Sequence, residues 1–133
     1  MSSRKQDWPV LLSTFLVERK DLPFTWGIND CCTFAAAAVE AMTDADHSIK
    51  WRRYKTLREA ATLLAEAGGV GGVADAALGA RIPVSFAQRG DVVMLSLDGR
   101  ESLAICDGVI AFAPGLERME AVPIREATCA WRV

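Results

Sequence analysis

Residues 24–34 constrain this chain more than any other stretch, because an aromatic-rich loop there leads directly into an alanine-rich apolar run. The segment reads Phe-Thr-Trp-Gly-Ile-Asn-Asp-Cys-Cys-Thr-Phe. This order predicts a loop that delivers Cys31 to the first turn of a buried helix, with the side chain of Asn29 or Asp30 as its cap. The unpaired amides and the helix dipole at such a place favour a thiolate, so Cys31 is a candidate nucleophile. The alternative is a small apolar residue buried at a helix start.

Length and charge exclude several classes of protein. The chain has 133 residues, which suits one domain over residues 1–133 with one core. The net charge is -2 and no basic cluster is present, so we expect no nucleic-acid partner. No apolar run is long enough to span a bilayer, and the first residues lack the apolar segment of a signal peptide.

Apolar periodicity predicts two helices before residue 43. Residues 5–20 carry one apolar stripe at helical spacing, and Pro23 prevents the helix from continuing. We expect this stripe to face the core, although a helix that binds a partner is the alternative. The second helix follows Cys31. A polar connection over residues 43–55 comes next, with Trp51 and Tyr54 expected against the core. The alternative for its basic and aromatic residues is contact with a phosphate or an acidic partner.

Glycines and a capping pattern define the next two helices. Thr56 and Glu59 match a capping box, which predicts a helix that ends at the glycine pair 68–69. A short helix is expected over residues 73–78. The glycines at 68–72 are not followed by Gly-Lys-Ser/Thr, so they predict helix ends rather than a phosphate-binding loop.

Strand patterns dominate after residue 81. Strands are predicted by β-rich runs that are separated by turn signals at residues 98–99, 107–108 and 114–115. These runs cover residues 91–97, 102–106, 109–112, 119–123 and 129–133. Helices followed by an antiparallel meander indicate an α+β fold.

The order of these motifs resembles that of the NlpC-type cell-wall cysteine peptidases, which have a reduced papain-like fold. Residues 24–27 and 30–34 are similar to the family's aromatic-Trp-Gly loop and Asp-Cys-Ser-Gly helix start. Residues 90–94 are similar to its Gly-Asp-Leu-Val-Phe strand, and residues 102–108 to its next strand, which opens with the catalytic histidine. The resemblance implies N-terminal helices packed on a small antiparallel sheet. It also implies that Cys31 has the nucleophile's position, in a loop ordered by Trp26, Gly27 and Asp30.

The chain departs from this family at the catalytic base. Ser102, with Glu101 beside it, stands where the family has its histidine, and the strand at residues 109–112 has no polar residue to orient one. A cysteine hydrolase needs a group that removes the thiol proton and protonates the leaving amine. A serine hydroxyl does neither well, and losing such a base costs on the order of 10²–10⁴ in rate. His47, the only histidine, could serve only as a displaced base if its loop folded back over Cys31.

The sequence also resembles a group of small phage tail proteins related to these peptidases. They share Trp-Gly-x-x-Asp-Cys, Gly-Asp-Val-Val and a closing Ala-Trp-Arg, here residues 130–132. This resemblance implies a structural module of a tail tip or baseplate, located in the virion, with other tail-tip proteins as partners. The alternative is an active cysteine peptidase or amidase that acts on peptidoglycan peptides. A third, weaker hypothesis is a binding module whose cleft at residues 26–31 holds a peptide or a lipid-like ligand.

The other cysteines predict no further chemistry. Cys32 lies about 100° around the helix from Cys31 and is expected to pack inward. Cys106 and Cys129 fall in predicted strands and are expected in the core. A metal site built from three of these cysteines and His47 would lack the usual spacing of ligand pairs. We therefore expect no metal site and no cofactor.

Overall fold

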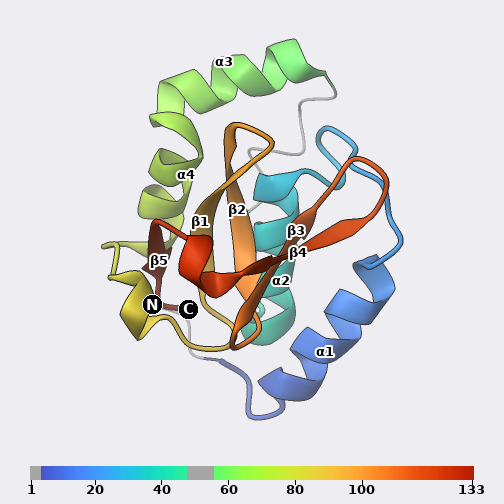
Figure 1. Cartoon of the computed structure of the whole chain (residues 1–133), viewed down its shortest axis with the longest axis vertical. Coiled ribbons are helices and arrows are strands. Elements are labelled where there is room, and N and C mark those ends of the chain that lie inside the picture. Colours follow the sequence, from blue (N-terminus) through green and yellow to red (C-terminus); the bar gives the residue numbers. More distant parts are fainter. Residues whose placement is uncertain (1–3, 48–55) are drawn as a thin grey trace.

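The computed structural model describes residues 4–47 and 56–133, and the contacts expected of Trp51 and Tyr54 lie outside these ranges. In the described ranges four α-helices precede one five-stranded antiparallel sheet, which confirms the predicted α+β class (Figure 1). The helices are α1 (Trp8–Arg19), α2 (Cys31–Thr43), α3 (Leu57–Ala67) and α4 (Gly69–Leu78). The strands are β1 (Val92–Leu97), β2 (Arg100–Cys106), β3 (Ile110–Pro114), β4 (Met119–Pro123) and β5 (Cys129–Trp131). Two short 3-10 helices, η2 (Val84–Phe86) and η3 (Ile124–Glu126), complete the described elements.

The sheet has the strand order β4-β3-β2-β1-β5. Strands β1 to β4 form the predicted meander, but β5 returns to pair with β1 at the opposite edge from β4. The β1–β2 turn has positive φ at Asp98 (53°) and Gly99 (79°), as a two-residue hairpin turn requires. The fifth strand therefore closes the sheet on its β1 side, which a simple meander would leave open.

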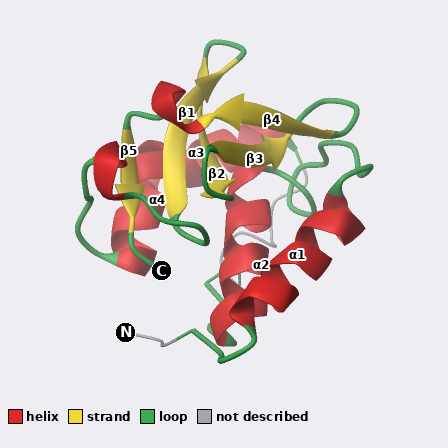
Figure 2. Ribbon diagram, turned by 60° about the horizontal axis from the view of Figure 1, so that its bottom comes forward, coloured by secondary structure: helices red, strands yellow, loops and turns green. Residues whose placement is uncertain are grey.

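Helix α2 packs on one face of the sheet, and α1 packs on α2 at the outside of the molecule (Figure 2). The side chains of α2 share a core with alternate residues of β1, β2 and β5: Val92, Met94, Leu103, Ile105 and Trp131. The opposite face is rich in alanine and is covered by η2, η3 and the loops next to them. Seven residues of α2 are buried, so its apolar residues face the core, and the helix predicted after Cys31 is confirmed.

Two helix starts differ from the prediction. Helix α1 begins at Trp8 rather than at residue 5, with Pro9 in its first turn, where a missing amide costs nothing. Helix α4 begins at Gly69, earlier than expected. Gly68 ends α3 with φ of +87°, and Gly69 begins α4, which confirms this pair as a helix end. Gly71 and Gly72 lie within α4, so for these two the prediction was wrong. A Cβ added at Gly72 would lie 1.8 Å from the carbonyl oxygen of Ala67, so the corner between α3 and α4 can be this tight only with glycine there.

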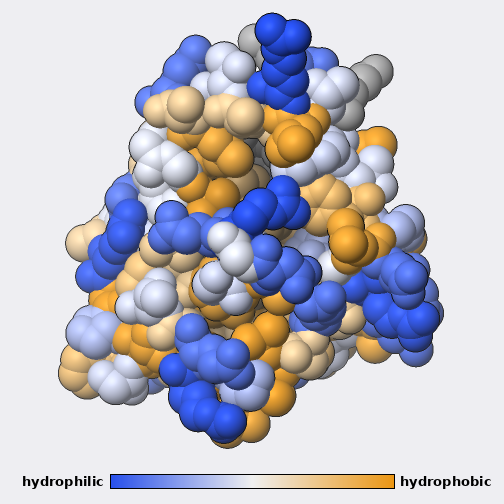
Figure 3. All heavy atoms as spheres, turned by 45° about the horizontal axis from the view of Figure 1, so that its top comes forward, coloured by the Kyte–Doolittle hydropathy of each residue, from blue (hydrophilic) through white to orange (hydrophobic). Residues whose placement is uncertain are grey.

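Helix α3 extends away from the sheet and packs mainly on α4 (Figure 1). Thr56 caps it as predicted, with Oγ1 accepting the amide of Glu59 at 3.2 Å. Only Ala60 is fully buried, and the Leu57 side chain is 57% exposed. Figure 3 views the molecule with this end brought forward and shows apolar side chains at its surface. The predicted apolar face is thus only partly covered by the described residues.

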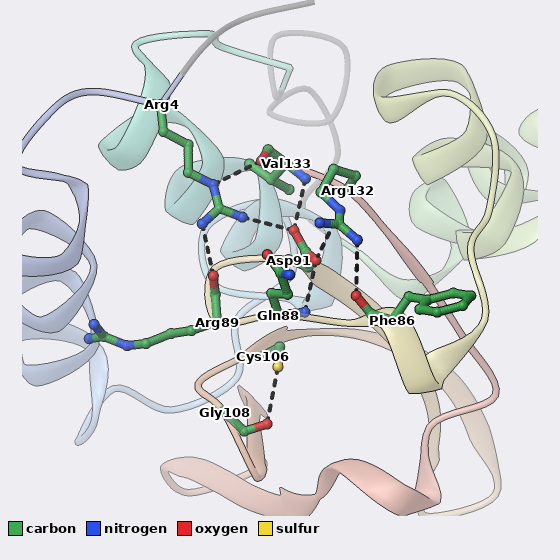
Figure 4. A network of polar contacts seen from close by, with 9 residues as sticks. All are labelled: Arg4, Phe86, Gln88, Arg89, Asp91, Cys106, Gly108, Arg132 and Val133. Atoms are coloured by element: carbon green, nitrogen blue, oxygen red, sulfur yellow. Dashed lines mark hydrogen bonds and ion pairs between the residues drawn. The ribbon is translucent and has the colours of Figure 1, made fainter.

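A fully buried carboxylate ties the two ends of the described chain to β1 (Figure 4). Asp91 Oδ1 accepts hydrogen bonds from Arg4 Nη2 at 2.8 Å and from the amide of Val133 at 3.0 Å. Its Oδ2 accepts the amide of Gln88 at 2.9 Å and forms an ion pair with Arg132 Nε at 3.6 Å. Because Asp91 directly precedes β1, this network fixes the start of the strand that pairs with both β2 and β5.

Candidate functional site

The loop before α2 is closed by its own backbone. The amides of Thr25 and Asn29 donate to each other's carbonyl oxygens at 3.1 and 2.7 Å. Gly27, between them, has φ of +76°, a conformation that favours glycine. The Asn29 side chain is buried and donates from Nδ2 to the carbonyl oxygen of Pro23 at 3.0 Å. The hydrogen bonds of this turn therefore hold the backbone that carries the aromatic rings. The Trp26 ring packs edge-on against the Phe24 ring, with 4.6 Å between the ring centroids.

Asp30 joins this loop to α2. Its Oδ1 accepts the amide of Thr33 at 2.9 Å, and Thr33 Oγ1 accepts the amide of Asp30 at 2.9 Å, which forms a reciprocal capping box. Its Oδ2 accepts the amide of Gly27 at 2.8 Å. The Asp30 side chain is almost fully buried, so all of these bonds are shielded from water. Asp30, rather than Asn29, is the cap, and it places Cys31 as the first residue of α2.

The half-buried Cys31 thiol is surrounded by groups that stabilise its thiolate. The pKa of Cys31 is lowered, first by a hydrogen bond with the Cys32 side chain and then by the backbone N–H of Leu103, while the Arg100 guanidinium adds a favourable positive charge. Burial and the Asp30 carboxylate oppose this shift. Cys31 is thus the more acidic of the two adjacent thiols, because its hydrogen bond with Cys32 raises the pKa of Cys32, and burial raises it further.

The Leu103 amide reaches Cys31 because β3 separates from β2 at this point. The Cys106 amide donates to Asp91 on the β1 side, so by alternation the Leu103 amide points to the β3 side. Strand β2 pairs with β3 only at two rows, Ile105 with Phe112 and Cys106 with Ala111. The N–H of Leu103 therefore lies beyond the β2–β3 hydrogen-bond ladder and donates to the Cys31 sulfur instead.

The structure does not bring Ser102 to Cys31. Ser102 lies opposite Leu95 in the β1–β2 ladder, and Leu95 belongs to the core on the sheet face away from α2. Side chains of opposed residues share a face, so Ser102 points away from the helix that carries Cys31. Its neighbour Leu103 is the residue of β2 that faces α2.

His47 follows the other end of α2. The helix has 13 residues, so it is about 20 Å long. His47 contributes to an open cavity of about 260 Å³ with apolar neighbours such as Val39 and Leu78. It is not among the described groups that act on the Cys31 thiol. His47 also lines a small apolar pocket with Cys32 and Leu103, but no described contact joins its imidazole to the Cys31 sulfur.

The remaining cysteines lie elsewhere. Cys106 is fully buried and donates from Sγ to the carbonyl oxygen of Gly108 at 3.4 Å, and burial raises its pKa. Its expected place in the core is confirmed, whereas Cys129 is only half-buried in β5. Across residues 4–47 and 56–133, no three His, Cys, Asp or Glu side chains converge into a group that could hold a metal ion. None of the helices in these ranges has both the length and the apolar character needed to cross a membrane.

Sequence reasoning missed Arg100 and Leu103. Arg100 directly follows the β1–β2 turn, and its guanidinium carbon lies 5.8 and 5.9 Å from the ring centroids of Trp26 and Phe24. The Asp98-Gly99 turn signal could have located Arg100 at the hairpin end. No local pattern could have located the Leu103 amide, because its role depends on where two strands separate.

This arrangement can stabilise a thiolate through donors and a positive charge. Hydrolysis also needs a titratable group close to the sulfur that returns a proton to the leaving amine. The Cys32 thiol is the only described side chain that is hydrogen-bonded to the Cys31 sulfur. The high pKa of that buried thiol makes it a poor exchanger near neutral pH.

Comparison with known proteins adds one family. No curated protein and no solved structure matches the chain. A family model described as "Domain of unknown function (DUF6950)" matches residues 3–133, which is nearly the whole chain. The chain therefore belongs to the DUF6950 family.

Proposed function

We propose that this protein is a structural module of a phage tail tip, built on a cysteine peptidase fold that keeps the nucleophile's position but has lost the base. The observation that carries the proposal is the set of groups around the Cys31 sulfur: the Cys32 thiol, the Leu103 amide and the Arg100 guanidinium. Each stabilises negative charge on sulfur, and none exchanges protons readily near neutral pH. The tail setting rests on the motif resemblance at residues 26–31, 90–93 and 130–132.

The arrangement of elements also supports a peptidase ancestry. A helix with a cysteine at its start packs on an antiparallel sheet, in the order expected for the reduced papain-like fold. Ser102 does not replace the histidine in space, because it lies on the sheet face away from α2. These features favour a structural role, because the described groups that act on the Cys31 sulfur do not supply the proton transfers that hydrolysis needs.

A second function, hydrolysis of peptidoglycan peptides, is favoured by one observation. The lowered pKa of Cys31 supplies the thiolate that a cysteine peptidase or amidase uses as its nucleophile. A base donated by a partner protein, or by His47 after movement of its loop, would then complete the site.

Turnover separates the two functions. The purified chain and its Cys31→Ser variant are incubated with intact peptidoglycan sacculi, and released fragments are quantified by mass spectrometry. We expect no fragment that depends on Cys31. Fragments from the wild type that disappear with Cys31→Ser would establish the hydrolase instead.

The tail setting has its own test. Mass spectrometry of purified tails, with chemical cross-linking before digestion, should detect this chain at a fixed ratio to the other tail proteins and linked to at least one of them. Particles that are complete, infectious and free of the chain would overturn the structural role.

A further inference from the structure

Amide hydrolysis and disulfide exchange make different demands on a thiolate. Cleavage of an amide leaves an amine that must be protonated as it departs, so a proton exchanger is needed beside the sulfur. When a thiolate attacks a disulfide, the leaving group is itself a thiolate, which departs as an anion and takes its proton from water. The groups described around Cys31 stabilise negative charge on sulfur and include no imidazole. This combination suits disulfides better than amides.

The two adjacent thiols at the start of α2 differ in their access to water. Cys31, the first residue of the helix, is half-buried, whereas the Cys32 side chain is buried and belongs to the core. Successive side chains of a helix are about 100° apart around its axis, so Cys31 turns toward the surface while Cys32 faces inward. Of this pair, Cys31 is therefore the thiol that a reagent in water can reach.

The fold also keeps Cys31 and Cys32 from joining to each other. Consecutive Cα atoms are about 3.8 Å apart, and disulfides usually need about 4.4–6.8 Å. A bond between the two sulfurs would distort the first turn of α2, where Asp30 caps the Thr33 amide and its carbonyl oxygen accepts the Phe34 amide at 2.8 Å. The neighbouring thiol therefore does not displace a group that is attached to Cys31 through an S–S bond.

Arg100 connects the Cys31 sulfur with the aromatic rings of the loop. Its guanidinium acts on this sulfur and lies 5.8 and 5.9 Å from the ring centroids of Trp26 and Phe24. Arg100 is exposed and both rings are half-buried, so these side chains are in contact with solvent. Of the two charged side chains that act on the sulfur, Arg100 favours the thiolate and the buried Asp30 opposes it. An uncharged reagent is therefore the cleanest probe of this site.

We propose that Cys31 is a reversible thiolation site that reacts with small disulfides. The Cys31 thiolate attacks one sulfur of a disulfide RSSR, an S–S bond forms between Cys31 and that sulfur, and the S–S bond of the reagent breaks. The electron pair leaves on RS⁻, which water protonates. The product is a mixed disulfide, no other oxidant is consumed, and an excess of the thiol RSH reverses the reaction. The inference rests on the proposed function in one respect, which is that no proton exchanger is described at Cys31.

Hydroxyethyl disulfide, which is small and uncharged, tests the site. The full chain is incubated with an excess of this reagent at neutral pH, samples are quenched with acid, and peptide mass spectrometry measures the adduct at each cysteine. Cys129 is the matched control, because it is also half-buried and is hydrogen-bonded to the Arg81 guanidinium, but it lies in β5 rather than at a helix start. Cys31 should react several times faster than Cys129, and the buried Cys32 and Cys106 should stay unmodified.

Two further measurements test the persistence of the adduct and its dependence on the fold. After the reagent is removed, the adduct should remain on Cys31 until a thiol such as mercaptoethanol is added. Its replacement by a Cys31–Cys32 disulfide would contradict a persistent adduct. In urea, which removes the helix start and the sheet amide, the rate ratio of Cys31 to Cys129 should fall to about one. A ratio that urea leaves unchanged would contradict a site that is made by the fold.

Failure of this inference can be told apart from failure of the proposed function. Fragments released from sacculi report hydrolysis, whereas the adduct reports exchange. Equal rates at Cys31 and Cys129 in the folded chain would overturn the thiolation site and leave the structural role standing. Fragments that depend on Cys31 would overturn the structural role, whatever the rates of exchange.

Discussion

The backbone N–H of Leu103, within strand β2, donates to the thiol sulfur of Cys31, at the first turn of α2. This bond adds a sheet amide to the positive helix terminus, and the Arg100 guanidinium lies close enough to contribute as well. The result is a thiol whose pKa is lowered by groups from two elements far apart in sequence, α2 and β2. Among the described groups that act on this sulfur, none is an imidazole.

The lowered pKa of Cys31 predicts unusual reactivity toward iodoacetamide. A thiol with a lowered pKa is ionised at lower pH, and iodoacetamide reacts with the ionised form. In a plot of alkylation rate against pH, the midpoint for Cys31 should therefore lie at a lower pH than that of a free cysteine. Cys32 should stay unlabelled because it is buried and its pKa is raised. Labelling at each site is measured by peptide mass spectrometry.

The contribution of Arg100 can be isolated in the same assay. Arg100→Gln removes a positive charge that lowers the pKa of Cys31, so the midpoint should move to higher pH and labelling at neutral pH should slow. Arg125→Gln, at an exposed position in η3, is the matched control and should leave the profile unchanged. Identical profiles for the wild type and Arg100→Gln would contradict this role.

Asp30 should be the most sensitive residue of the loop. Asp30→Ala removes the cap of α2 and the acceptor for the Gly27 amide, both in a buried setting. Losing a cap costs about 1–2 kcal/mol, and an unsatisfied buried amide adds about 1–3 kcal/mol. We therefore expect about 2–5 kcal/mol less stability in urea unfolding, from the sum of these two effects.

Asp30→Asn provides the control for this prediction. Its carbonyl oxygen can still accept the Thr33 amide, but its NH₂ group would face the Gly27 amide, so the loss should be intermediate. Equal stability of the alanine variant and the wild type would show that water replaces these bonds.

Local signals account for the parts of the fold that the sequence predicts well. Asp98-Gly99 needs only its own backbone to turn, and Asp30 needs only the amides three residues before and after it. The Cys31 helix was likewise predictable from an alanine-rich run directly after a cap. Each of these features is decided within a few residues.

Non-local geometry accounts for what the sequence left open. Ser102 appeared at the position of the catalytic histidine, but its side of the sheet is set by its pairing with Leu95. The Leu103 amide depends on where β3 separates from β2, and the return of β5 to β1 depends on how loops cover the far face of the sheet. One residue of strand register changes which side chain faces Cys31, and motif order does not encode register.

The corner between α3 and α4 predicts different costs for two neighbouring glycines. Gly72→Ala would place a Cβ 1.8 Å from the Ala67 carbonyl oxygen, a backbone atom that can move only if the corner opens. At Gly71 the nearest atom, at 2.5 Å, is the end of the flexible Arg81 side chain. Overpacking a core typically lowers the free energy of unfolding by about 1–3 kcal/mol. We expect Gly72→Ala to lower it by about 3 kcal/mol or more, and Gly71→Ala by clearly less. Thermal unfolding compares the two, and the reverse order would contradict the tight corner.

The buried carboxylate of Asp91 predicts strong coupling between the first and last residues of the described chain. Asp91→Ala leaves the largely buried Arg4 guanidinium and the Val133 amide without their acceptor, and breaking a buried pair costs about 3–5 kcal/mol. Arg4→Met removes three hydrogen bonds, to Asp91, Arg89 and Val133, and should also destabilise strongly.

A double-mutant cycle tests whether these two residues act as one unit. The double variant should be more stable than the sum of the single losses implies, because removing Arg4 after Asp91 no longer breaks their ion pair. Lys5→Met is the matched control: its 2.6 Å ion pair with Asp44 is largely exposed, so its loss should change the free energy of unfolding by about 0–1 kcal/mol. Additive losses for Arg4 and Asp91 would mean that Gln88, Arg132 and Val133 hold the carboxylate without Arg4, and that the two ends of the chain are anchored independently.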